Sequence, residues 1–163
     1  MDKVKVYHAG TEIIENPVCS QGRERLDFGC GFYVTDIFDQ ARMWATRKSQ
    51  ERLMPGIINE YILDRKAMLK EARSKIFIEY GDEWLDFVVK CRLGEDIWKD
   101  YDYIEGGVAD DRVIDTVNLY MQGFIDKERA LLNLKYLRPN NQICLINQTL
   151  TDKYLKYSGY SSF

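Results

Sequence analysis

Three side chains of ligand-binding types stand at predicted strand ends or beside glycines: His8 in YHAG, Tyr33 in GCGFYVT and Gln142 in NNQICLIN. An imidazole exchanges a proton or a hydrogen bond, a phenol offers an aromatic face, and a carboxamide both donates and accepts hydrogen bonds. Together they suit a site that holds a ligand by stacking and oriented hydrogen bonds. Taken singly, each also fits a structural role, as a hydrogen-bonded strand histidine, a core tyrosine or a polar strand end.

The signatures of several common enzyme classes are absent from the sequence. It has no GxxxxGK[ST] phosphate loop, no GxGxxG after a strand, no GxSxG elbow and no HExxH. The four cysteines form no CxxC pair and the chain has one histidine, so we expect no metal site. A cysteine nucleophile with His8 as its base stays open, although this combination of residue types is easily met by chance.

The composition is that of a folded chain without a basic surface. Of the 163 residues, 45% are hydrophobic and 13% are aromatic, which excludes a disordered chain. The formal net charge of −3 disfavours stable binding to nucleic acid, and the cations of residues 65–75 stand among Asp64 and Glu71, as on a solvated surface. No stretch reaches the roughly 18 apolar residues that span a membrane, and the first residues lack a signal core, so we expect a cytoplasmic protein.

Alternation and helical periodicity predict the elements that must position these side chains. Residues 3–8 alternate as a half-buried strand whose apolar face ends at His8, and a long loop follows to Gly29. Further strands are predicted over 29–35, 57–63, 75–79, 101–107 and 140–147, and helices over 35–53, 64–72, 81–94, 109–123, 126–137 and 151–157. Thr35 or Asp36 is the expected cap of the first helix. The mixed order predicts one α+β domain over residues 1–163 with a frayed tail at 158–163.

The stretch DFGCGFYVT, at 27–35, joins a glycine-rich turn to a strand that carries Tyr33. Together with VYHAGT, DQARMWA, IEGGVADDRV and NQICLIN, it resembles the ADP-ribosyltransferase superfamily, and within it a bacterial family of short domains of unknown function. The resemblance spans essentially residues 4–150. It implies a split β-sheet with flanking helices and a cleft for NAD, in which His8, Tyr33 and Gln142 correspond to a His-Tyr-(Glu or Gln) arrangement.

The resemblance implies a role for each of the three residues in cleaving nicotinamide from NAD. His8 would donate a hydrogen bond to a ribose hydroxyl or the adenosine side, Tyr33 would stack on the nicotinamide ring, and Gln142 would hold the 2′-hydroxyl of the nicotinamide ribose. Cleavage develops positive charge on that ribose, so an aromatic face and oriented hydrogen bonds matter more than a strong base. The residues implied to contact NAD, without a metal, are His8, Ala9, Gly10, Thr11, Gly31, Phe32, Tyr33 and Asp110.

Two positions depart from the family's pattern. The family has glycine directly after the histidine, where main-chain groups clamp the nicotinamide carboxamide; this chain has Ala9, which still presents both groups. Gln142 replaces the glutamate of many active transferases and cannot offset positive charge. Asp110 and Asp111 are the further carboxylates, placed either to cap the helix that follows or to face the cleft.

The glycines of the turn would make room beneath the stacked ring, while Phe32 would point the opposite way as a core anchor. The resemblance thus leads us to expect a mono-ADP-ribosyltransferase whose acceptor is a protein, a nucleic acid or a small molecule. By the same analogy it is the toxin of a bacterial toxin–antitoxin pair with a small antitoxin protein. Three alternatives stay open: a domain that binds NAD or ADP-ribose without turnover, a plain interaction domain, and an enzyme that transfers an RNA 2′-phosphate to NAD.

Overall fold

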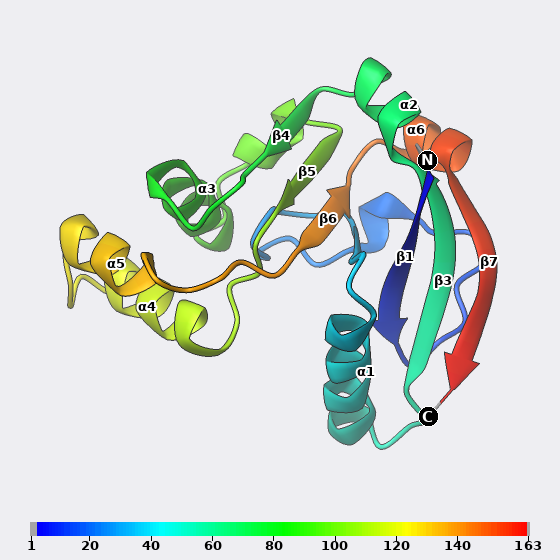
Figure 1. Ribbon diagram of the computed structural model, residues 1–163, viewed down its shortest axis with the longest axis horizontal. Coiled ribbons are helices and arrows are strands. Elements are labelled where there is room, and N and C mark those ends of the chain that lie inside the picture. Colours follow the sequence, from blue (N-terminus) through cyan, green and yellow to red (C-terminus); the bar gives the residue numbers. More distant parts are fainter. Residues whose placement is uncertain (1–2, 163) are drawn as a thin grey trace.

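The fold is built on two β-sheets, which a computed structural model describes for residues 3–162 (Figure 1). The first sheet has the order β1-β3-β7 and consists of the antiparallel strands Lys3–Gly10, Ile57–Asp64 and Leu155–Ser162. The second has the order β2-β6-β5-β4, from Phe32–Val34, Gln142–Leu145, Tyr103–Gly106 and Ser74–Ile76, with β4 and β5 parallel. This α+β architecture confirms the class predicted from the sequence.

Six α-helices flank the sheets within the described residues. Their bounds are α1 Phe38–Arg52, α2 Arg65–Glu71, α3 Asp82–Arg92, α4 Asp111–Met121, α5 Lys127–Leu134 and α6 Gln148–Tyr154. Short 3-10 turns at Cys19–Gln21 and Ile97–Asp100 lie in the loops. The helical periodicity of the sequence therefore located each of these α-helices, with shifts of a few residues at their ends.

The two sheets meet at a bridge between Tyr7 and Thr35. The Tyr7 N–H donates to the Thr35 carbonyl over 2.8 Å, and the Thr35 N–H donates to the Tyr7 carbonyl over 2.9 Å. Apolar side chains of both sheets fill a shared core, among them Val6, Tyr61 and Leu63 from the first sheet and Phe32, Ile143 and Leu145 from the second. The bridge holds the end of β1 beside β2, which brings His8 next to Tyr33.

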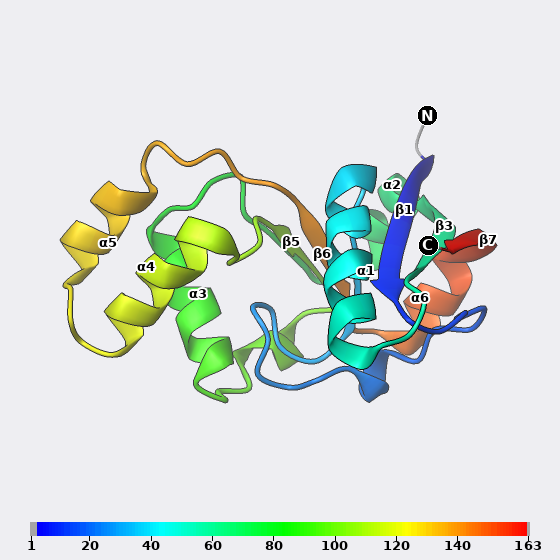
Figure 2. The ribbon, with the colours of Figure 1, turned by 90° about the horizontal axis from the view of Figure 1, so that it is seen from below.

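Helices cover the faces of the sheets that point away from this shared core. Ala41 and Ala45 of α1 pack on Ala9 and Ile58 of the first sheet, and their small side chains allow the helix to approach β1 closely (Figure 2). On the second sheet, α3, α4 and α5 bury a core that includes Phe28, Trp84, Phe87, Ile104, Val113, Leu134 and Cys144. Figure 2 shows these three helices at the end of the molecule opposite to β1, β3 and β7.

The C-terminal segment corrects one prediction. Residues 158–162 are not a frayed tail but belong to β7, which pairs along β3 with an irregularity at Glu60/Tyr61; Phe163 lies outside the described residues. The segment alternates inward and outward in the first sheet, and β3 supplies its hydrogen-bonding partners. Because that partner strand is far earlier in the chain, no local signal in SGYSSF indicated the pairing.

The start of α1 corrects a second prediction, that of its N-cap residue. The N-cap residue is Ile37, without a side-chain cap, rather than Thr35 or Asp36. The Thr35 hydroxyl donates instead to the Asn141 carbonyl over 2.7 Å and accepts a hydrogen bond from the Ile37 N–H over 3.1 Å. Thr35 therefore ties the beginning of α1 to the strand that carries Gln142.

Candidate functional site

The phenol of Tyr33 organises the turn that precedes β2. Its hydroxyl donates to the Gly29 carbonyl over 2.6 Å and accepts a hydrogen bond from the Phe28 N–H over 3.0 Å. Burial raises the pKa of this phenol well above its ordinary value, so the hydroxyl stays protonated. Tyr33 is only partly buried, and its side chain packs against the edge of the core on the second sheet while its hydroxyl is fixed.

The glycines of the turn allow close packing of neighbouring protein atoms. The expectation from the sequence is instead that they leave room beneath a ring stacked on Tyr33. Gly29 has a φ of +79°, and a Cβ there would lie 2.1 Å from the Trp98 ring. A Cβ at Gly31 would lie 2.4 Å from the Cys144 Sγ. Both positions are therefore closed to larger residues by neighbouring protein atoms.

Tyr33 and Gln142 lie on one face of the second sheet. Tyr33 is directly opposite Cys144 in the β2–β6 pairing, and Gln142 is two residues before Cys144 on the same strand. Side chains two apart on a strand share a face, and opposite residues of an antiparallel pair share it too. Phe32 points to the other face, where it packs in the core between the sheets, as expected.

The carboxamide of Gln142 is oriented by two hydrogen-bond acceptors. Its Nε2 lies 3.0 Å from the Asp27 Oδ2 and 3.4 Å from the Gly107 carbonyl. A carboxylate and a carbonyl accept only, so the NH₂ group must face them and the Oε1 must point away. Within the described residues no hydrogen bond reaches this Oε1, and no buried side-chain oxygen there lacks a partner, so the Oε1 belongs to the 4% of Gln142 that stays exposed.

Asp27 is a further candidate site residue, which the sequence did not single out. The Arg92 Nε and its NH2 nitrogen donate to the Asp27 Oδ1 over 2.8 and 2.6 Å, and the Ala109 N–H donates to the Oδ2 over 2.8 Å. With Gln142, this makes Asp27 the centre of a buried polar network. The one sequence signal for Asp27 was its position at the start of DFGCGFYVT. Its hydrogen-bond partners come from distant segments, so no local pattern indicated the network.

His8 lies on the other side of β2 from the Tyr33 ring. Its Nδ1 is 2.7 Å from the Tyr33 carbonyl, and its ring stacks on Phe32 with centroids 4.3 Å apart. Burial lowers the pKa of His8 to about 4, opposed by the bond to the carbonyl and aided by the Lys48 charge, so the ring is neutral at pH 7. The proton must be on Nδ1 to bond a carbonyl, which leaves Nε2 as an acceptor. The expected role as donor is therefore reversed.

The lowered pKa of His8 makes stability depend on pH. Since the folded value of about 4 is below the ordinary 6.5, unfolding takes up a proton between these values. The contribution of neutral His8 is complete above the unfolded pKa and declines as the pH falls toward the folded one. We expect urea titrations to show the free energy of unfolding decreasing from about pH 7 to pH 5.5, and less so in His8→Asn. An unchanged slope in the variant would contradict this assignment, since the chain has one histidine.

The end of β1 presents main-chain groups to the same edge as the bridge. Successive strand residues direct these groups to alternate edges, and Tyr7 uses its pair for Thr35. Ala9, two residues on, therefore directs its N–H and carbonyl to that edge beyond the bridge. The Lys48 Nζ donates to this carbonyl over 3.0 Å, and the neighbouring Thr11 hydroxyl accepts from the Arg52 NH1 nitrogen over 3.0 Å. Gly10 lies buried between the two contacts.

Asp110 lies at the N-cap of α4 but does not cap it through its side chain. Its carboxylate instead accepts hydrogen bonds from the Asn140 Nδ2 at 3.2 and 3.4 Å. The Asn140 Oδ1 in turn accepts from the Val108 N–H over 2.7 Å, so Asn140 ties the loop before α4 to the start of β6. Asp110 thus stands beside the segment that leads to Gln142.

Comparison of nearly the whole sequence with known protein families identifies the family of the chain. Residues 4–157 match the model of a family described as protein of unknown function DUF3990. The chain belongs to the DUF3990 family. No curated protein and no solved structure matches it. The membership confirms the expected domain of unknown function.

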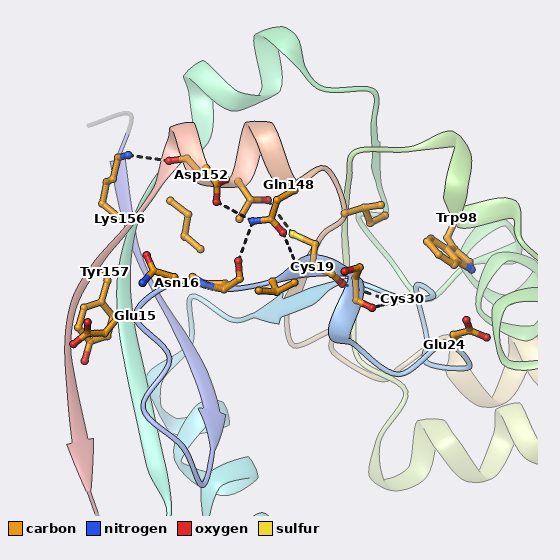
Figure 3. A pocket seen from close by; sticks show the side chains of 16 residues that line it. Glu15, Asn16, Cys19, Glu24, Cys30, Trp98, Gln148, Asp152, Lys156 and Tyr157 are labelled. Carbon is orange, nitrogen blue, oxygen red and sulfur yellow. Dashed lines mark hydrogen bonds between the residues drawn. The ribbon is translucent and has the colours of Figure 1, made fainter.

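In this DUF3990 chain, a hollow of about 1000 Å³ opens beside the glycine turn (Figure 3). It is lined by residues 15–20, by parts of α6 and β7, and by Cys30 and Trp98. Its polar groups bond one another: the Gln148 Oε1 accepts from the Cys19 N–H over 2.9 Å, and the Gln148 Nε2 donates to the Asp152 Oδ1 over 2.8 Å. None of the residues predicted to contact NAD lines it, so it is separate from the Tyr33–Gln142 face.

Within residues 3–162, two kinds of feature are absent, a membrane-spanning helix and a cluster of metal-binding side chains. Over this range no helix has both the length and the apolar character needed to cross a bilayer. Over the same range, His, Cys, Asp and Glu side chains nowhere gather in threes as they would around a metal ion.

Proposed function

We propose that this chain is an NAD-dependent mono-ADP-ribosyltransferase with the split-sheet fold of that superfamily. The observation that carries the proposal is the shared face of Tyr33 and Gln142. An aromatic ring whose hydroxyl is fixed projects from β2, and a carboxamide whose Oε1 is left to accept a hydrogen bond projects from the neighbouring β6. The division of the strands into two sheets, joined where His8 meets Tyr33, supports the same fold.

The reaction breaks the bond between the nicotinamide nitrogen and the ribose carbon. The bonding electron pair leaves with nicotinamide, and the ribose becomes positively charged. An acceptor oxygen or nitrogen then forms the new bond to that carbon and releases its proton to solvent. Tyr33 supplies an electron-rich face to the cationic ring, and the Gln142 Oε1 accepts from the 2′-hydroxyl of the ribose. Asp27 acts through Gln142 as a positioning residue, because it fixes which way the carboxamide points.

This chemistry is tested with purified protein, labelled NAD and cell lysate. We expect transfer of label to a lysate component and release of nicotinamide by the wild type. An absence of both label transfer and nicotinamide release, in the wild type as well as in Tyr33→Ala and Gln142→Ala, would contradict the proposal. The same assay, fractionated by nuclease and protease treatment, assigns the acceptor to nucleic acid, protein or small molecule.

The toxin assignment rests on the family resemblance, together with the expected cytoplasmic location and antitoxin partner. Expression of the wild type in a bacterial host is expected to arrest growth, and Gln142→Ala is expected to relieve the arrest at equal protein level. Arrest by both proteins alike would assign the toxicity to something other than transferase chemistry.

A second candidate is a domain that binds NAD without turnover. It is favoured by the Lys48 ammonium on the Ala9 carbonyl, where the resemblance places the nicotinamide carboxamide, and by the amide at position 142. Calorimetry separates the two: tight NAD binding without nicotinamide release over hours would select binding alone.

A further inference from the structure

Two cations of α1 reach the end of β1. Lys48 and Arg52 are one turn apart near the C-terminal end of the helix, so their side chains leave it on the same side. The Lys48 Nζ donates to the Ala9 carbonyl over 3.0 Å, and the Arg52 NH1 nitrogen donates to the Thr11 hydroxyl over 3.0 Å. Both partners are neutral oxygens, so these contacts leave the two positive charges unbalanced.

A third cation, Arg23, lies in the loop before β2, close enough for its charge to act on Lys48. Burial lowers the pKa of Lys48, and the charges of Arg52 and Arg23 lower it further, against a smaller opposing effect of Glu51. Arg23 follows Gly22, whose Cα lies so close to the Gly31 main chain that a Cβ would meet the Gly31 carbonyl oxygen at 2.3 Å. Arg23 thus follows directly on the base of the turn that leads to Tyr33.

Lys48 and Arg52 carry like charges to the end of β1, where Lys48 is half-buried, and the positive charge of Arg23 acts on Lys48 as well. Repulsion in such surroundings is costly, and an anion that bridges the cations converts it into charge-assisted hydrogen bonds. A diphosphate fits this requirement better than a carboxylate, because it carries two charges and several acceptor oxygens across the span of two or three cations.

We propose that Lys48, Arg52 and Arg23 hold the diphosphate of NAD. This rests on the proposed function, since it gives the NAD cleft its phosphate subsite. The same proposal accounts for the occupied Ala9 carbonyl: when the diphosphate draws the Lys48 ammonium away, the carbonyl becomes free to accept from the nicotinamide carboxamide. In the unliganded chain Lys48 thus occupies a group that the ligand later uses.

The test is titration calorimetry of NAD, nicotinamide riboside and inorganic pyrophosphate with Lys48→Met and, separately, Arg23→Met. Lys70→Met is the control, because Lys70 is an exposed lysine of α2 whose loss changes the net charge equally. We expect each test variant to weaken NAD binding about ten- to a hundredfold. Nicotinamide riboside binding, which involves no phosphate, should stay unchanged in Arg23→Met and should not weaken in Lys48→Met, which frees the Ala9 carbonyl for the carboxamide. The control should bind all three as the wild type does. Circular dichroism and the unfolding midpoint verify that each variant is folded; Arg23 is exposed and serves if Lys48→Met does not fold.

The outcomes separate the subsite from the function. Equal NAD affinity in the wild type and both folded variants would overturn the subsite and leave the proposed function standing. If the wild type bound pyrophosphate but not NAD, and the variants lost pyrophosphate binding, the cations would still form a diphosphate site, but the proposed function would be contradicted. Binding of neither NAD nor pyrophosphate to the wild type would overturn both.

Discussion

Replacing Gln142 by alanine is expected to lower the rate of nicotinamide release from NAD about a hundred- to a thousandfold, the usual effect of losing one preorganised polar contact at a reacting centre. The loss should fall on kcat more than on the Kd for NAD, because the contact to the 2′-hydroxyl strengthens as the ribose becomes positive. Single-turnover assays with quantified nicotinamide measure this directly. Release that falls less than about threefold would remove Gln142 from the reaction.

The matched change to glutamate separates chemistry from position. Many active transferases carry glutamate here, yet in this chain a carboxylate at 142 would face the Asp27 Oδ2, which now lies 3.0 Å from the Gln142 Nε2, and the Gly107 carbonyl. We therefore expect Gln142→Glu to lower the free energy of unfolding by about 1–3 kcal/mol and to give no gain in rate. The double variant Asp27→Asn/Gln142→Glu restores a donor between the two positions and should recover part of that stability. If Gln142→Glu were as stable as the wild type, Asp27 would not be the reason for glutamine at position 142.

Tyr33 allows its hydroxyl and its ring to be tested separately. Tyr33→Phe keeps the ring but leaves the Gly29 carbonyl and the Phe28 N–H without their partner, so we expect a loss of about 1–3 kcal/mol in the free energy of unfolding with NAD turnover largely retained. Tyr33→Ala also removes the aromatic face. A desolvated cation–ring contact is worth about 2 kcal/mol or more, so turnover by the folded alanine variant should fall at least about thirtyfold.

Thermal unfolding and nicotinamide release, measured on the same preparations, decide between the two roles. Equal loss of turnover in the phenylalanine and alanine variants would mean that Tyr33 only builds the turn. A fall in turnover confined to the alanine variant is the expected result.

The sequence predicted the elements around the site well because their patterns are local. The alternation ending at His8 predicts β1, and the apolar run after Gln142 predicts β6; both strands are present. Strand alternation also separates Phe32 from Tyr33, as the packing shows. These features depend on neighbouring residues alone, so one sequence suffices to predict them.

The contacts that define the site depend on residues far apart in the chain. Asp27 meets Gln142 across 115 positions, and Lys48 meets Ala9 across 39. Neither pair leaves a periodic pattern, and the reversed role of His8 follows from one main-chain carbonyl that no motif specifies. The β7 strand was missed for the same reason, because only its pairing with β3 distinguishes it from a polar tail.

The most direct test of the central claim is a crystal structure of the chain with a non-hydrolysable NAD analogue. The expected structure has the pyridine ring against Tyr33 and the Gln142 Oε1 within hydrogen-bonding distance of the ribose 2′-hydroxyl. An analogue seated instead in the hollow between Cys19 and Trp98, or absent from crystals soaked at saturating concentration, would contradict the account.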